Sequence, residues 1–159
     1  MSRLLELEAL YRARHSDFVR VARAITGDPE RAHEAVQDAF AEAVRTSGSF
    51  RGDGPLDAWV WRAVVNAARK ALRRPLVEVG LRGRPEAELS TPPVTTELAP
   101  LIAALPERQR LVVFLRYYAD LDYRTIAEVL DVETGTVSAT LSAAHAGVRR
   151  ALQEVTADA

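Results

Sequence analysis

One stretch of the sequence combines side chains that could hold a nucleic acid. Its polar positions recur at steps of four, three and four residues, so on a helix they share one face. They are Arg62, Asn66, Arg69 and Arg73, with Lys70 beside them. Such a face can bind phosphates through its cations while the amide reads a base edge. A solvated surface helix is the alternative, because cationic stripes are common on protein surfaces.

The residues around this face indicate how a base could be accommodated. The glycine-rich loop from 47 to 54 precedes it and could let the backbone approach an extruded base. Trp61 lies nearer the polar side of the helix and could stack on such a base. Trp59 falls on the apolar stripe, which predicts that it packs in the core.

An acidic ridge runs along the preceding predicted helix. Glu34, Asp38 and Glu42 recur at steps of four, with Gln37 alongside, and such a ridge suits a basic partner helix. An ordinary acidic surface helix is the competing interpretation. Phe40 lies on the apolar stripe of the same helix.

The second half contains a pattern typical of a helix-turn-helix. Its apolar positions are Ile126, Ala127 and Leu130 before the turn and Val137 and Leu141 after it. The small Ala127 lets two helices approach closely, and Asp131 tolerates the left-handed backbone that the turn favours. Many helical hairpins that never bind DNA share this pattern, so by itself it leaves the function open.

Caps and helix breakers divide the first half into three predicted helices. The first ends near Thr26, because Gly27 can close it in a left-handed cap. Pro29 is preset for the first position of the second helix. Pro55 opens the third helix, which ends near Arg74.

The segment from Pro75 to Thr96 combines prolines and glycines with little periodicity. It predicts an extended linker that lets its two neighbours move independently. Helical periodicity returns beyond it, and no β alternation is found. The sequence therefore predicts an all-α protein of two small helical domains joined by a linker that contains proline and glycine.

Composition narrows the functions that the chain could have. The 159 residues include no cysteine and three scattered histidines, which excludes thiolate chemistry and gives no metal-ligand spacing. No nucleophile-base set is present, so an enzyme has little support and no cofactor is expected. No secretory start or membrane-crossing run is found, which predicts a cytoplasmic protein without a membrane partner.

Charge is distributed unevenly around a net value of −1. Between positions 62 and 74 there are five basic residues and no acid. From 97 to 154, eight acids exceed six arginines. The second half is therefore expected to attract DNA only weakly.

Several motifs occur together in one order along the chain. They are the GDP start followed by VQDAF, the run WVWRAVVNAARK, the segment LPERQR, and the pair RTIAEVL and ETGTV. In this order they resemble regions two and four of the extracytoplasmic-function (ECF) sigma factors of the sigma-70 superfamily. The resemblance implies a sigma region two helical bundle over 1–75, a flexible linker over 76–96 and a sigma region four helix-turn-helix over 97–155.

The function implied by the resemblance is that of a transcription initiation factor, not an enzyme. Such a factor binds RNA polymerase core at its clamp coiled coil and its flap, and it recognises and melts promoter DNA. The clamp contacts implied on the second helix are Glu34, Gln37, Asp38 and Phe40.

The two promoter elements are implied to have separate sites. The residues assigned to the minus-ten element are Ser49, Phe50, Arg51, Trp61, Arg62, Asn66, Arg69, Lys70 and Arg73. The minus-thirty-five element would meet a recognition helix over 135–150. The residues assigned to it are Arg124, Thr136, Ser138, Thr140, Ser142, His145 and Arg149.

The sequence departs from the family in two places. Arg31 and His33 stand where acids usually begin the docking helix. The recognition helix offers mostly Ser, Thr, Ala and His where the family carries several Lys and Arg, which removes cations that bind phosphate.

Two hypotheses follow from the weak recognition helix. The chain is either a sigma factor whose upstream contact is assisted by an activator, or a sigma-like regulator that has lost promoter reading by its second domain. An anti-sigma factor is a further candidate partner.

Overall fold

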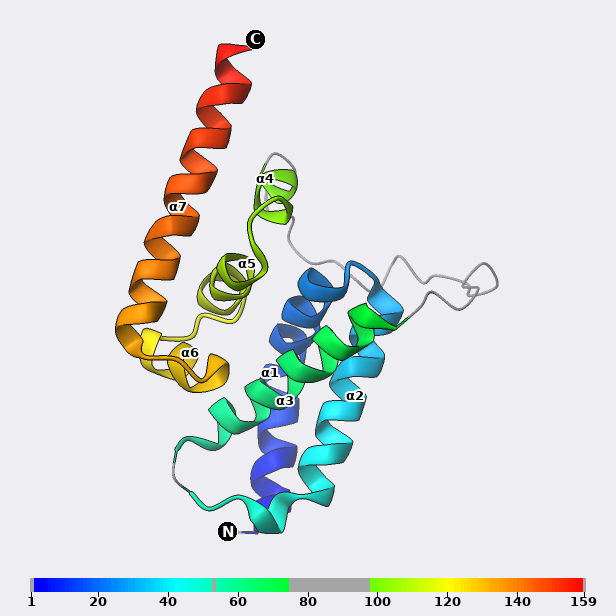
Figure 1. The fold of residues 1–159 in the computed structure, drawn as a ribbon. Coiled ribbons are helices and arrows are strands. Elements are labelled where there is room, and N and C mark those ends of the chain that lie inside the picture. The colour runs from blue at the N-terminus through cyan, green and yellow to red at the C-terminus, as the bar shows by residue number, and fades with distance from the viewer. Residues whose placement is uncertain (1, 53, 75–97, 159) are drawn as a thin grey trace.

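Helices make up most of the chain that the computed structural model describes, residues 2–52, 54–74 and 98–158 (Figure 1). No strand occurs among these residues, so the predicted all-α class is confirmed. None of their helices combines the length and apolar character that a membrane crossing needs. The predicted linker over 76–96 lies outside the described residues. The elements are α1 (Arg3–Thr26), α2 (Pro29–Arg45), η1 (Ser47–Ser49), α3 (Leu56–Arg73), α4 (Ala99–Ala103), α5 (Glu107–Val113), η3 (Phe114–Tyr118), α6 (Tyr123–Leu130) and α7 (Thr134–Ala157).

The first part of the chain is a bundle of α1, α2 and α3 (Figure 1). Gly27 ends α1 in the left-handed conformation, with φ of 71°, and its N–H donates to the carbonyl of Arg23 at 2.8 Å. Pro29 begins α2 and Pro55 directly precedes α3, because the fixed φ of proline suits a helix start. The three helices predicted for this part are therefore confirmed.

An aromatic cluster fills the space between these three helices. Trp61 from α3 is fully buried, and its ring centroid lies 4.4 Å from that of Phe18 on α1. Phe40 from α2 meets Phe18 at 5.2 Å and Tyr11 at 4.9 Å, in both cases edge to face. Because large rings bury much apolar area, the cluster fixes the three helices relative to one another.

The second helical part, residues 98–158, contains the predicted helix-turn-helix in α6 and α7. The carboxylate of Asp122 caps α6 by accepting the N–H of Thr125 at 2.8 Å, and this bond holds the pKa of Asp122 below its usual value. Asp131 adopts the left-handed conformation between the two helices, with φ of 56°. Ala127 and Leu141 are buried, as the sequence predicts.

The stretch between α5 and α6 departs from a continuous α-helix. Helix α5 passes into η3, where the carbonyl of Phe114 accepts the N–H of Ala119 at 3.2 Å in a π-type bond. Asp120 follows with φ of 54°. The wider turn ends the helix between two buried leucines, Leu115 and Leu121.

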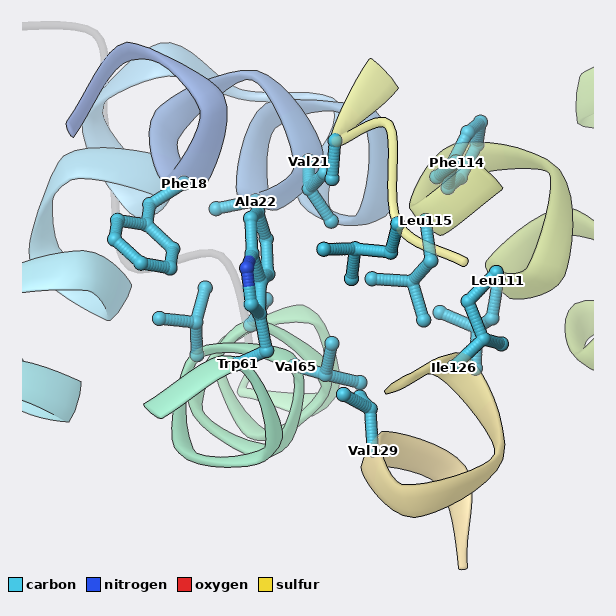
Figure 2. Packing of buried hydrophobic residues seen from close by; sticks show 14 of the residues in the cluster. Phe18, Val21, Ala22, Trp61, Val65, Leu111, Phe114, Leu115, Ile126 and Val129 are labelled. Atoms are coloured by element: carbon cyan, nitrogen blue, oxygen red, sulfur yellow. The ribbon is translucent and has the colours of Figure 1, made fainter. Parts of the chain in front are cut away.

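The two helical parts share one apolar core (Figure 2). Val65 on α3 lies near Val129 on α6, and Ile126, Leu111 and Leu115 continue the cluster toward α5 and η3. All five side chains are buried. Helix α3 is thus covered by α1 and α2 on one side and by α6 on another.

Replacing Leu141 by alanine is expected to lower the free energy of unfolding by about 2–5 kcal/mol, because the removed side chain leaves a cavity. Leu141 is 3% exposed, whereas Leu152 on the same helix is 41% exposed. Leu152→Ala is therefore the matched control, and it should change stability by no more than about 0.5 kcal/mol. Urea denaturation followed by circular dichroism measures both variants. Equal losses would contradict the placement of Leu141 in the core.

Candidate nucleic-acid interface

The polar side of α3 carries the basic face, which consists of Arg62, Asn66, Arg69, Lys70 and Arg73. Four of its members are exposed, and Arg69 is half-buried. The apolar side of the same helix is buried. The structure therefore brings the predicted cations and the amide together on one helix surface.

The two tryptophans of α3 differ from their predicted roles. Trp61 is fully buried against Phe18, so the expectation that it stacks on a base is wrong. Trp59 packs at the margin of the core and is only half-buried, and its ring centroid lies 5.2 Å from that of Phe50 in the loop. The reason is that α3 is covered on two sides, so its buried arc is wider than one apolar stripe and includes the position of Trp61.

The loop before α3 and the exposed part of Trp59 border a cavity of about 340 Å³. Ser49 and Arg51 line this cavity and are exposed. Phe50 is half-buried, and the guanidinium of Arg3 lies 4.6 Å from its ring centroid. An aromatic surface beside cations is what the stacking of an unpaired base requires. Sequence reasoning missed Trp59 as a contributor to this surface.

An open groove of about 600 Å³ runs between α2 and α3 on the other flank of the basic face. Asp38 and Glu42 line it from α2, Arg62 and Lys70 line it from α3, and Arg74 lines it just after α3 ends. Alanines of both helices lie between these charged walls. The acidic ridge and the basic face are therefore neighbours across one groove.

The predicted docking residues of α2 divide into two groups. Glu34, Gln37 and Asp38 are exposed, and a carboxylate oxygen of Glu34 lies 3.7 Å from the guanidinium of Arg74. Phe40 is only 8% exposed, because its ring packs between Tyr11 and Phe18. Its prediction as a surface contact is therefore wrong, whereas the other three lie at the surface.

Arg31, which departs from the family pattern, has a structural role. Its guanidinium donates to the backbone carbonyls of Ala71 at 3.0 Å and Arg74 at 3.2 Å, where α3 ends. The last carbonyls of a helix have no partner within that helix, so a cation from α2 satisfies them. Arg31 therefore links α2 to the C-terminal end of α3.

The residues predicted for upstream DNA lie mostly at the surface of the helix-turn-helix, and those on α7 flank both sides of its buried stripe. Those that are exposed are Arg124, Thr136, Ser138, Ser142, His145 and Arg149, while Thr140 is half-buried. The ring nitrogen Nε2 of His145 shares a hydrogen bond of 2.7 Å with the hydroxyl of Tyr117. The surface of α7 is accessible, but only its far end carries arginines.

Comparison with known proteins identifies the family. Residues 10–75 match the model of Sigma-70 region 2, and residues 96–145 match that of Sigma-70, region 4. The ECF RNA polymerase sigma factor SigM of Mycobacterium tuberculosis is 32% identical over 155 residues, which cover 91% of this chain and 76% of SigM. The chain belongs to the ECF sigma factors. It is therefore an RNA polymerase sigma factor, a transcription initiation factor that binds polymerase and promoter DNA.

Other relatives of this ECF sigma factor agree with the assignment. The RNA polymerase sigma-E factor of Streptomyces avermitilis is 32% identical over 167 aligned positions, which cover 98% of this chain and 90% of the relative. The fold is similar to that of the sigma factor RpoE of Bartonella quintana, solved in complex with the anti-sigma factor NepR, with a TM-score of 0.68 and 18% identity over 94% of this chain and 95% of RpoE. The alternative of a sigma-like regulator that has lost promoter reading by its second domain is not favoured.

Two acids of the second helical part of the sigma factor lie against the basic face, and sequence reasoning missed both. Glu107 forms an ion pair with Arg69 at 2.7 Å. The backbone carbonyl of Glu128 accepts a hydrogen bond from Arg62. Glu107 begins α5 and Glu128 is on α6, so both approach α3 through contacts between distant parts of the sequence, which no local pattern indicates.

The different environments of the two tryptophans can be tested by fluorescence. Trp59→Phe leaves Trp61 as the only indole, so emission should shift to shorter wavelength and resist quenching by iodide, because Trp61 is fully buried. Trp61→Tyr should leave Trp59, whose emission lies at longer wavelength and is quenched readily. Circular dichroism controls for folding of both variants. The reverse pattern in folded proteins would contradict the placement of the two rings.

Proposed function

We propose that the basic face and the loop before it bind the non-template strand of the minus-ten element as the promoter opens. The proposal rests on one observation. The exposed cationic face of α3 adjoins a cavity that is lined by the aromatic rings of Trp59 and Phe50. The sigma factor itself contributes binding and no catalytic site. Because polymerase and chromosome are in the bacterial cytoplasm, we place its action there.

The basic face has the two properties that such binding requires. Its cations can replace counterions along the sugar-phosphate backbone, which gives affinity for any sequence. Asn66 can donate and accept hydrogen bonds at a base edge, and an unpaired base can stack beside Trp59. Phosphate contacts and base contacts therefore come from different residues and can be separated by mutation.

Arg73→Ala is expected to weaken single-strand binding equally for all sequences and to reduce the slope of log K against log salt by about 0.7. Arg73 is exposed and belongs to the basic face, so its phosphate contact is lost without disturbing the core. Arg150→Ala, an exposed arginine on α7, is the matched control and should leave the slope unchanged. Fluorescence anisotropy of a labelled single strand measures both variants.

Asn66→Ala provides the second arm of this experiment. It should relax the preference at one base position while leaving the salt slope unchanged, because an amide releases no counterion. A pool of single-stranded minus-ten sequences shows the preference. If Arg73→Ala and Asn66→Ala both bind as the parent does at low salt, this assignment of the basic face is wrong.

The exposed acids of α2 support a second assignment, to RNA polymerase core. The acidic ridge includes Glu34 and Asp38, and Gln37 is exposed beside them. A ridge of this charge fits a basic helix of the polymerase clamp coiled coil. The buried position of Phe40 makes it a support for α2 in this assignment.

Asp38→Lys is expected to weaken binding to polymerase core, by about 2–5 kcal/mol if the contact is desolvated and by much less at a rim. Glu154→Lys makes the same charge change at an exposed position on α7 and is the matched control. A pull-down titration with purified core measures the affinities, and circular dichroism confirms the helical content. Unchanged affinity in both Asp38→Lys and Glu34→Lys would contradict this docking face.

The upstream contact is proposed to depend on partners. Ser138, Ser142 and His145 can donate hydrogen bonds to phosphates or base edges, but they release no counterions as lysine and arginine would. The polymerase flap or an activator would therefore hold α7 at the minus-thirty-five element. The anti-sigma factor bound to the RpoE neighbour supports the proposal that a protein of that kind controls this chain as well.

A further inference from the structure

Two of the three histidines come together where α1 packs against α2 (Figure 1). The ring centroids of His15 on α1 and His33 on α2 lie 6.2 Å apart. The third histidine, His145, lies on α7, where it shares a hydrogen bond with Tyr117. The fold thus pairs two imidazoles that belong to different helices.

The nitrogen atoms of both imidazoles are not used by the fold. His15 and His33 are each half-buried, so part of each side chain faces solvent. Among the described residues, no side chain or backbone group forms a hydrogen bond with either ring. A neutral imidazole has one nitrogen lone pair that can bind a metal ion. The pair therefore offers two nitrogen ligands to an ion from solvent.

Aromatic packing holds the His15 ring in place. The ring centroid of Tyr11 lies 4.7 Å from that of His15 and 4.9 Å from that of the buried Phe40. Phe40 is on α2, the helix that also carries His33, so both histidines belong to one rigid pair of helices. Ligands that are positioned before the ion arrives lose less conformational entropy when it binds.

The separation of the two rings suits a single metal ion between them. Bonds from Zn²⁺ to imidazole nitrogen of about 2.0–2.1 Å place the centroids of two ligating rings about 5–6 Å apart. The observed 6.2 Å is close to this range, and a small rotation of the half-buried side chains brings the nitrogens onto one ion. Imidazole suits Zn²⁺, Ni²⁺ and Cu²⁺, whereas Mg²⁺ and Ca²⁺ prefer oxygen ligands.

We infer that His15 and His33 together bind one divalent transition-metal ion, represented by Zn²⁺, and that this ion links α1 to α2. No group of three or more His, Asp or Glu among the described residues could hold a metal ion, so water fills the remaining positions. With two protein ligands, the ion is held less tightly than in a four-ligand structural zinc centre. The pair lies on α1 and α2, apart from the basic face of α3.

Zinc titration of the full chain tests the pair, with the third histidine as the matched control. Zinc chloride at about ten times its dissociation constant should raise the Tm by about 3–6 °C, because the ion binds the assembled pair and not the unfolded chain. His145→Gln should keep this shift, whereas His15→Gln and His33→Gln should each lose it. Magnesium chloride at the same ionic strength controls for a general salt effect, and equilibrium dialysis measures the zinc bound per chain.

The pattern of shifts distinguishes the histidine pair from other zinc ligands. Equal shifts in the parent and all three variants would show that zinc binds carboxylates elsewhere, and would overturn the site. Loss of the shift in only one of His15→Gln and His33→Gln would contradict the pairing. A parent chain that binds no zinc at millimolar concentration would overturn the site as well.

A measurement on the unaltered chain does not depend on the folding of the variants. Paramagnetic Ni²⁺ broadens the NMR signals of imidazoles that bind it, so two of the three histidine ring signals should disappear early in a titration. His145→Gln identifies the third signal, which should persist. Early loss of the His145 signal, equal broadening of all three or retention of all three would each overturn the assignment of His15 and His33 as the ligands.

Discussion

The packing of α3 between α1 and α6 constrains the rest of the structure. Trp61 is buried against Phe18, and Val65, one turn further along the same face, enters the core shared with Val129. This buried face leaves a polar arc on α3, and the basic face occupies it. Two cations of this sigma factor, Arg62 and Arg69, therefore lie beside the contact between its two parts.

Local chemistry made much of the fold predictable from sequence. Gly27 and Asp131 adopt the left-handed backbone that their places at helix ends favour, and Asp122 caps α6. The basic face was also predictable, because its residues share a helical period and need only one helix to bring them together. Phe40 is instructive, since periodicity placed it inside and the family resemblance placed it outside; its 8% exposure agrees with periodicity.

Features that depend on distant contacts could not be predicted in this way. Reading α3 as a helix with one apolar stripe misplaced Trp61, because its ring packs against Phe18 of α1. The role of Trp59 depends on its approach to Phe50, across a loop. Arg31 looked like a defect in an acidic docking helix, yet its carbonyl partners lie 40 and 43 positions away in the sequence. Residue spacing holds no direct signal for such pairs.

The excess of acids in the second helical part can be explained by its contact with the basic helix α3. Between 97 and 154 the acids outnumber the arginines, which reduces long-range attraction to DNA. In the structure Glu107, Glu128 and Asp131 line the cleft or cavity beside the basic face. Acids at these places complement the cations of α3 when the parts are together and would repel the phosphates of a strand bound there. The same charge pattern that weakens DNA binding by α7 thus favours association of the second part with α3.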